Sequence, residues 1–226
     1  MASYFTLTLD TTGPASPSIS LDSGAEYATA QLVTATIGTT DSPTTGYQMK
    51  IWGDVDTTHN ANIQGTEGAS SWISYSTSQQ VKLSSGDGSK TVYLKIRDDV
   101  YNESSQASDT IILDMTLPVV TVSNVSATKI SKVSGKDEMT FQFSGDSIFD
   151  AYKVKVVATS GAAHDTGTQI GTANGSANVA GSTGNYPAST PITVTINGAD
   201  LEVASGGDGA KIIKVFIQDN AGNWSA

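Results

Sequence analysis

Short runs of alternating apolar and polar residues recur along the chain, separated by Gly, Asp, Asn, Ser and Thr. From residue 91 to 97 every second residue is apolar, namely Val92, Leu94 and Ile96. Side chains of a strand alternate between its two faces, so this pattern predicts a strand with one buried face and one wet face. Helical periodicity is nearly absent. The pattern therefore predicts an all-β fold built from short antiparallel strands.

The alternation predicts strands in both halves of the chain. We expect them at Ser18–Asp22, Gln31–Ile37, Tyr47–Gly53, Gln80–Leu83, Thr91–Arg97, Thr110–Asp114, Val119–Ser123, Met139–Ser144, Ala151–Ala158, Thr190–Ile196 and Ile212–Gln218. The stretch Gly161–Ala188 has few apolar residues, which predicts a long loop with one irregular strand around Gln169–Ala173.

One passage is written twice. With an offset of 121 residues, eight of the twenty positions from 86 to 105 are identical in 207–226: Gly86, Asp87, Gly88, Lys90, Ile96, Asp98, Asn102 and Ser104. In each copy an Asp-Gly turn leads into a strand. The repeat predicts two tandem copies of one antiparallel β-sandwich, which the resemblance described next implies to be immunoglobulin-like. We place an N-terminal arm at 1–13, the first sandwich at 14–116 and the second at 117–226.

The second copy ends in Asp219-Asn220-Ala221-Gly222-Asn223, and two segments read Leu9-Asp10-Thr11-Thr12-Gly13-Pro14 and Leu113-Asp114-Met115-Thr116-Leu117-Pro118. These motifs resemble bacterial immunoglobulin-like (Big-type) repeats, whose D-x-A-G-N turn precedes a last strand and an L-D-T-T-x-P linker. The resemblance covers most of the first half and the last twenty or so residues of the second. It implies the sandwich fold, and it implies little about function because one fold hosts many functions.

The order of these motifs predicts a missing strand. In the first sandwich the repeated passage is followed by a last strand and the linker, whereas nothing follows it in the second. Tyr4–Pro14 matches this strand and linker, although no sandwich precedes it. One interpretation is a frayed leader beside a second sandwich of six strands. The other is strand addition at an open sheet edge.

The candidate assembly residues come from the arm and from the last strand. In the arm they are Phe5, Leu7 and Leu9. In the strand Ile213, Val215 and Ile217 are predicted to face inward, while Phe216 and Ile212 are predicted to face outward as a small exposed apolar patch.

The net charge of −10 and the pI of about 4.4 disfavour nucleic-acid binding, which needs fields of Lys and Arg. Cysteine is absent, which excludes disulfides and thiolate zinc sites. No stretch is long and apolar enough for a membrane span, and no secretion signal is visible. The two histidines, His59 and His164, lie in loop-like sequence without a nucleophile placed beside them, so we expect no enzyme and no cofactor.

Two ligand sites remain open. The resemblance implies that Ca²⁺ could bind between the domains, with Asp98, Asp99, Asn102 and Asp114 supplying oxygen ligands; the alternative is that Asp98 and Asp219 cap their turns with side-chain hydrogen bonds. Trp72 and Tyr75 follow a loop and are candidates for contact with a glycan, whereas Trp52 is expected to pack in the core or at the end of a strand.

Big-type domains occur on phage virions and in bacterial adhesins. The short chain without a signal predicts a virion structural or decoration protein on the exterior surface, on the capsid rather than the tail. Its expected partners are other virion proteins and copies of itself, joined by pairing of strand edges. The alternative function is an adhesion module that binds carbohydrate on a host surface.

Overall fold

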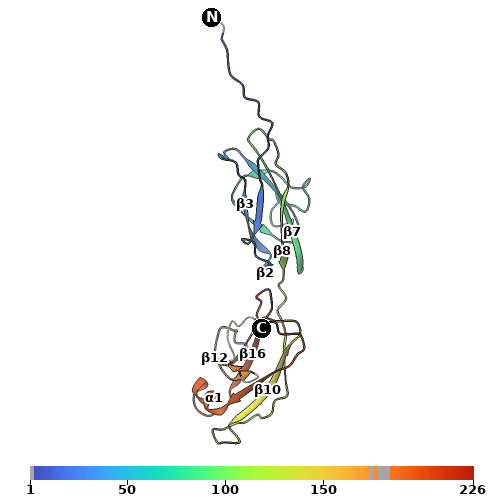
Figure 1. Ribbon diagram of the computed structural model, residues 1–226. Coiled ribbons are helices and arrows are strands. Elements are labelled where there is room, and N and C mark those ends of the chain that lie inside the picture. Colours follow the sequence, from blue (N-terminus) through green and yellow to red (C-terminus); the bar gives the residue numbers. More distant parts are fainter. Residues whose placement is uncertain (1–2, 174–175, 178–183) are drawn as a thin grey trace. The chain divides into compact units, whose positions relative to one another are not determined.

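A computed structural model describes residues 3–173, 176–177 and 184–226 (Figure 1). The chain divides into two compact units, Met1–Met115 and Thr116–Ala226. The sequence placed the boundary one residue later, after residue 116. We describe each unit by itself.

Unit 1 is a sandwich of two sheets. Its strands are β1 (Ser18–Leu21), β2 (Tyr27–Ala28), β3 (Leu32–Gly38), β4 (Gln48–Gly53), β5 (Ile73–Ser74), β6 (Ser78–Lys82), β7 (Gly88–Arg97) and β8 (Ala107–Leu113). One sheet has the order β1-β3-β6 and the other β2-β8-β7-β4-β5. The short β2 pairs with β8 in parallel, and the other neighbours are antiparallel.

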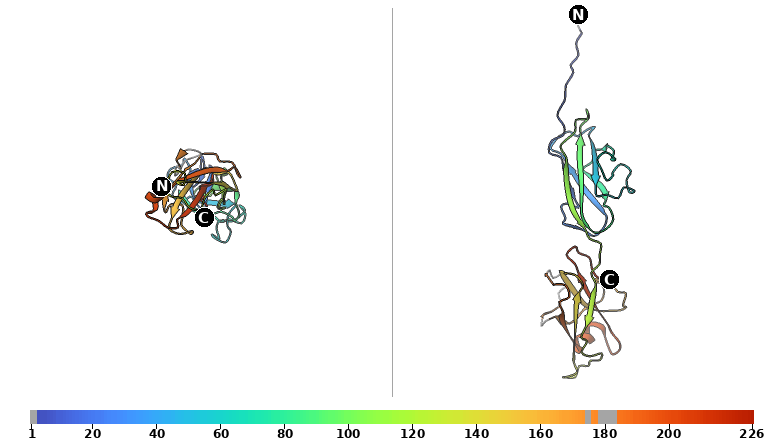
Figure 2. Two further views of the ribbon diagram at one scale, coloured as in Figure 1. Left: turned by 90° about the horizontal axis from the view of Figure 1, so that it is seen from below. Right: turned by 90° about the vertical axis from the view of Figure 1, so that its right-hand side faces the viewer.

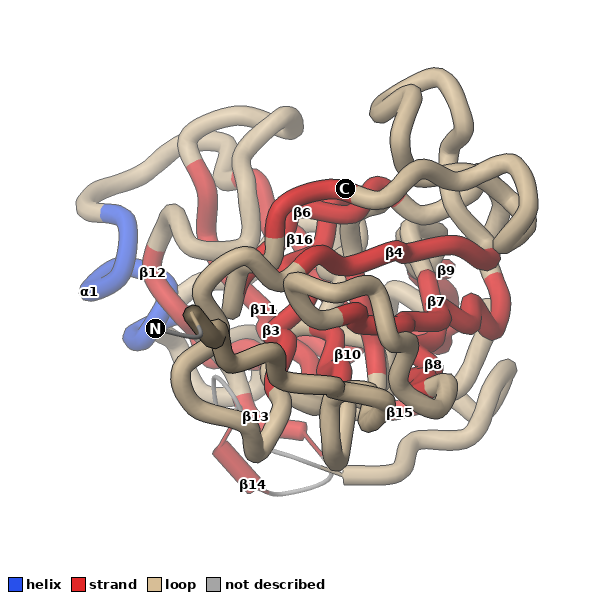
Figure 3. Tube along the Cα trace, turned by 90° about the horizontal axis from the view of Figure 1, so that it is seen from above, coloured by secondary structure: helices blue, strands red, loops and turns tan. Residues whose placement is uncertain are grey.

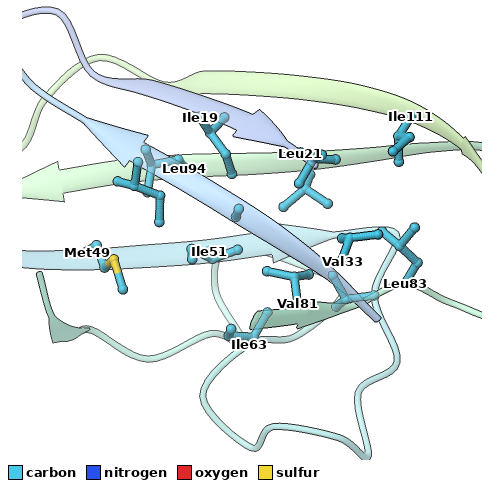
Figure 4. Close-up of a cluster of buried hydrophobic side chains, with 14 of the residues drawn as sticks. Ile19, Leu21, Val33, Met49, Ile51, Ile63, Val81, Leu83, Leu94 and Ile111 are labelled. Atoms are coloured by element: carbon cyan, nitrogen blue, oxygen red, sulfur yellow. The ribbon is translucent and has the colours of Figure 1, made fainter. Parts of the chain in front are cut away.

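The inward faces of these strands make the core of unit 1. Alternate residues of β7, which are Val92, Leu94 and Ile96, are fully buried, as the alternation predicts. They pack with Ile111 and Leu113 of β8 and with apolar residues of the opposite sheet. Figure 4 shows part of this cluster, in which side chains from both sheets meet between the ribbons.

Unit 2 repeats this plan with differences. Its elements are β9 (Val120–Ser123), β10 (Glu138–Gly145), β11 (Ala151–Val157), β12 (Thr168–Gln169), β13 (Thr172–Ala173), β14 (Ser176–Ala177), β15 (Ile192–Asn197), α1 (Gly198–Ser205) and β16 (Ile212–Gln218). The sheets have the orders β14-β13-β15-β10-β9 and β12-β11-β16. Figure 2 shows the strands of each unit running side by side.

The all-β fold with two Ig-like sandwiches in tandem is confirmed. Every predicted strand is present within a few residues of its expected ends. The short helix α1 was not predicted; it is blue in Figure 3, where red strands and tan loops make up the other described residues. The predicted loop Gly161–Ala188 contains β12, β13 and β14, and its residues 174–175 and 178–183 lie outside the described part.

Candidate assembly edge of the second sandwich

The repeated strands β7 and β16 occupy equivalent places. Ile51 of β4 pairs with Leu94 of β7, and Val154 of β11 pairs with Val215 of β16. The offset from Leu94 to Val215 is 121 residues, which is the offset of the sequence repeat. Because the register is preserved along both pairs, β16 is the counterpart of β7 residue by residue.

The turn that follows β7 and the turn that follows β16 have the same hydrogen bonds. Asp98 accepts hydrogen bonds from the backbone N–H and the side-chain Nδ2 of Asn102, at 2.8 and 2.9 Å. Asp219 accepts the same two bonds from Asn223, at 2.8 and 3.1 Å. Both aspartates are buried, so these bonds satisfy carboxylates that water does not reach. The repeated Asp and Asn residues therefore fix the turn that ends the strand.

A serine two residues further on closes each turn against its strand. The Ile217 N–H donates to Ser225 Oγ at 3.1 Å, and the Ser225 N–H donates to the Ile217 carbonyl at 2.9 Å. Ile96 and Ser104 make the same pair of bonds in unit 1. The N–H and C=O of Ile217 both point away from β11. Because every second residue of a strand points these groups to the same side, those of Val215 and Ile213 also point away from β11.

The two units differ at this side of the strand. In unit 1, β8 pairs with β7 from Leu113 opposite Gly88 to Ala107 opposite Leu94. In unit 2, β16 is the last strand of its sheet, and no described residue forms a strand on its free side. The described part of unit 2 therefore holds no counterpart of β8.

Two apolar grooves mark the place that β8 fills in unit 1. One, of about 610 Å³, is lined by residues that include Met139, Ile196, Gly209, Lys211 and Ile213. The other, of about 370 Å³, is lined by Val120, Val122, Ile213, Val215 and others. They share Ile213. Val122 of β9 is 51% exposed, whereas Leu21 in the first strand of unit 1 is fully buried.

The strand β16 is also shorter than β7 at the end where β8 pairs. In unit 1, Gly88–Lys90 pair with β8 alone, because the pairing with β4 begins at Val92. Their counterparts Gly209–Lys211 lie outside β16, which begins at Ile212. The start of this strand thus depends on a neighbour that the described part of unit 2 does not supply.

The N-terminal arm is an apolar segment without a covering partner among the described residues. Residues 3–10 belong to no strand, and Phe5, Leu7 and Leu9 are 86%, 83% and 86% exposed. Figure 1 draws this arm as an extended segment leading away from the first strands. Its base is fixed at Gly13, where a Cβ would lie 2.1 Å from the Glu103 carbonyl oxygen.

One of the predicted interface residues, Phe216, needs correction, whereas Ile217 faces inward as predicted. Phe216 was expected in an exposed patch, but it is fully buried. The segment 159–166 covers it: Lys214 lies over its ring at 4.9 Å and donates to the carbonyls of Ser160 and Ala162 at 2.9 Å each. Ile217 is also fully buried, with its backbone already bonded to Ser225. Of the outward pair, Ile212 alone is exposed.

The segment 159–166, which covers Phe216, includes the half-buried His164. His164 stacks on Trp224 with 4.5 Å between ring centroids, and Lys153 Nζ lies 3.2 Å from His164 Nδ1. A lysine ammonium only donates, so Nδ1 is the acceptor of a neutral imidazole. Burial, and then the charge of Lys153, lower the pKa of His164. This cluster is structural packing over Phe216.

The predicted glycan residues lie at the edge of unit 1. Trp72 is half-buried, with Lys50 Nζ at 4.7 Å and the Arg97 guanidinium at 4.5 Å from its ring centroid. Arg97 also lies 4.2 Å from the ring of Tyr101. Tyr75 packs against the core of unit 1. Trp52 is buried but stacks on Tyr93, on the face of the sheet opposite to the core cluster.

The proposed calcium ligands are not brought together. Asp98 and Asn102 follow Arg97 at one end of β7, whereas Asp114 follows Leu113, which pairs with Gly88 at the other end. A ten-residue strand spans about 33 Å, far beyond a coordination shell. Among the described residues no group of three or more His, Cys, Asp or Glu side chains is placed to hold a metal ion.

A scan against protein-family models and a search of curated proteins found no match to this chain. Among solved structures, it is similar to the fibronectin(III)-like modules of Clostridium thermocellum CbhA, at 11% identity with a TM-score of 0.44, over 92% of this chain and 89% of that one. It is also similar to chitinase ChiA74 from Bacillus thuringiensis, at 15% identity with a TM-score of 0.30, over 92% of this chain and 30% of the chitinase. No helix among the described residues is long and apolar enough to cross a membrane.

Proposed function

We propose that this chain is a structural or decoration protein of a phage virion, displayed on the particle exterior and joined to other virion chains by strand pairing. The observation that supports the proposal is the edge strand β16 beside an apolar groove, where unit 1 has β8. The family resemblance of the turn and linker motifs supports the virion, and on that resemblance we propose the capsid rather than the tail.

The open edge suits assembly for a physical reason. A strand at a sheet edge presents N–H and C=O groups that can pair with another chain. An added strand gains affinity from main-chain hydrogen bonds and specificity from pockets for alternate side chains. Here the grooves around Ile213 would receive those side chains. This role involves no catalytic step and no cofactor.

The test asks whether the chain is part of the particle and whether the groove holds it there. Mass spectrometry and immunogold labelling of purified virions should detect the chain on the exterior. Ile213→Asp places a charge in the groove and should abolish incorporation. Ile212→Asp, one residue away on the exposed face, should leave it intact. A chain that is missing from the particles would refute the proposal.

The second candidate function is binding of a host-surface carbohydrate. The observation that favours it is the exposed Tyr101, which with half-buried Trp72 flanks Arg97. Aromatic rings beside a hydrogen-bond donor suit sugars. Reproducible binding on a glycan array that is lost in Trp72→Ala would establish this function, and an array without specific binding would reject it.

A further inference from the structure

The strand that fills the groove of unit 2 can be identified from the pairing in unit 1. With an offset of 104 residues, Ala107–Leu113 of β8 correspond to Ser3–Leu9 of the arm. Thr6 and Leu9 are identical to their counterparts, and Leu7 replaces Ile111. The identities continue through Asp10, Thr12 and Pro14 into the linker.

We propose that the arm of a second copy of this chain adds to β16 as the missing last strand, in the register that β8 takes on β7. The inference rests on the proposed function and names the partner of its open edge. It joins copies head to tail, because each copy offers one arm and one open edge at β16.

The register follows from two offsets: 121 residues from β7 to β16, and 104 residues from the arm to β8. Lys90 pairs with Ile111 and Gly88 with Leu113 in unit 1. The counterpart pairs are Lys211 with Leu7 and Gly209 with Leu9. Gly209, Lys211 and Ile213 line the larger groove, so Leu7 and Leu9 meet the apolar space that Ile111 and Leu113 fill in unit 1.

The exposed side chains of the arm fit the same register. Phe5, Leu7 and Leu9 occupy one face of an extended strand, and Thr6 and Thr8 the other. Thr6 is the counterpart of Thr110, whose Oγ1 lies 3.0 Å from Thr91 Oγ1 on the outer face of the sheet. The counterpart of Thr91 is Ile212, which is 40% exposed. Thr6 and Ile212 would thus lie side by side in solvent.

The pairing also accounts for the length of β16. Gly209–Lys211 should become strand when the arm is present, since Gly88–Lys90 are strand through pairing with β8 alone. The linker Leu9–Pro14 then follows the donated strand, as Leu113–Pro118 follows β8. Each junction between copies therefore repeats the order of strand and linker that joins the two units of one copy.

Disulfide trapping tests the partner and the register together. The chain has no cysteine, so introduced cysteines report single pairs. Thr6→Cys chains mixed with Ile212→Cys chains, and Thr8→Cys chains mixed with Ala210→Cys chains, should form interchain disulfides. The crossed mixtures, Thr6→Cys with Ala210→Cys and Thr8→Cys with Ile212→Cys, should yield about tenfold less, because diagonal neighbours lie about 7–8 Å apart, farther than a disulfide allows.

The outcomes separate this inference from the function on which it rests. Equal yields in all four mixtures, or no interchain disulfide at millimolar concentration, would overturn the proposed register and partner. So would a disulfide within one chain in a Thr6→Cys/Ile212→Cys variant at high dilution. If particles still carried the chain and lost it in Ile213→Asp, the virion role would stand with a different chain in the groove.

Discussion

Single residues set the turns on which both units depend. Asp98 is 3% exposed and accepts from the N–H of Val100 and from Asn102. Asp98→Ala would leave these donors without their buried acceptor. We expect unit 1 to lose about 2–4 kcal/mol of unfolding free energy, measured in urea, because each bond to a charged group contributes about 1.5–3 kcal/mol.

The neighbouring Asp99 provides the matched control. It is exposed, so Asp99→Ala should change the stability by less than about 0.5 kcal/mol. Equal losses in the two variants would show that the buried carboxylate does not hold the turn.

His164 gives unit 2 a dependence on pH. Burial and the nearby ammonium of Lys153, together with Lys155, lower its pKa, and only Asp165 opposes this. A histidine whose pKa is lowered on folding favours the neutral folded state. Its contribution is complete above the ordinary value of about 6.5 and is lost as the pH falls through the lowered pKa.

We therefore expect the melting temperature of unit 2 to fall as the pH drops from 7.5 to 5, and His164→Gln to reduce that dependence. His59→Gln, an exposed loop change in unit 1, is the control. If the melting temperature of unit 2 kept its full pH dependence in His164→Gln, titratable groups other than His164 would cause that dependence.

At the scale of elements, β16 differs from β7 in having no strand on one side within the described part of the chain. A free peptide of sequence YFTLTLDTT should bind a chain that lacks residues 1–10 and should raise the melting temperature of unit 2. Ligand at 100 times its Kd adds about 2.7 kcal/mol to stability. The same peptide with Asp in place of both Leu residues should have no effect, and melting curves of the two samples check this.

The sequence predicted much of this element-level picture, since strand periodicity depends on which face is buried. The repeat located β7 and β16, and the motif order predicted the open side of β16, where the described residues of unit 2 form no counterpart of β8. The burial of Phe216 could not be predicted, because alternation assigns a face and does not show that residues 159–166 cover it.

The helix α1 was missed because its eight residues have no apolar stripe, although Asn197, whose side chain accepts a hydrogen bond from the Ala199 N–H, was a visible capping signal. The sequence could not show that Asp98 and Asp114, two of the candidate calcium ligands, lie toward opposite ends of β7.

At the scale of the whole molecule, the proposed pairing of one arm with one open β16 edge per copy would make a head-to-tail contact. Such contacts form a ring where the geometry closes and a filament where it does not. Burying Leu7 and Leu9 contributes about 3–6 kcal/mol, while association costs about 4–15 kcal/mol before main-chain bonds are counted. A single junction is therefore weak.

We expect light scattering after size-exclusion chromatography to show a mass that rises with concentration. Leu7→Asp with Leu9→Asp should give monomers, because two charges would enter the groove. Thr6→Asp with Thr8→Asp adds the same charge to the outer face and should still associate. A mass that does not change with concentration in the unaltered chain would contradict self-assembly.

Hydrogen exchange at Gly209, Lys211 and Ile213 tests the central claim most directly, because the amides of these alternate residues point to the edge that the arm should cover. In the full chain at assembling concentration we expect slow exchange at these positions. In a chain that lacks residues 1–10 we expect fast exchange at them, with unchanged protection of β7 in unit 1. Equal exchange at Gly209, Lys211 and Ile213 in the two chains, under conditions where the full chain associates, would contradict completion of β16 by the arm.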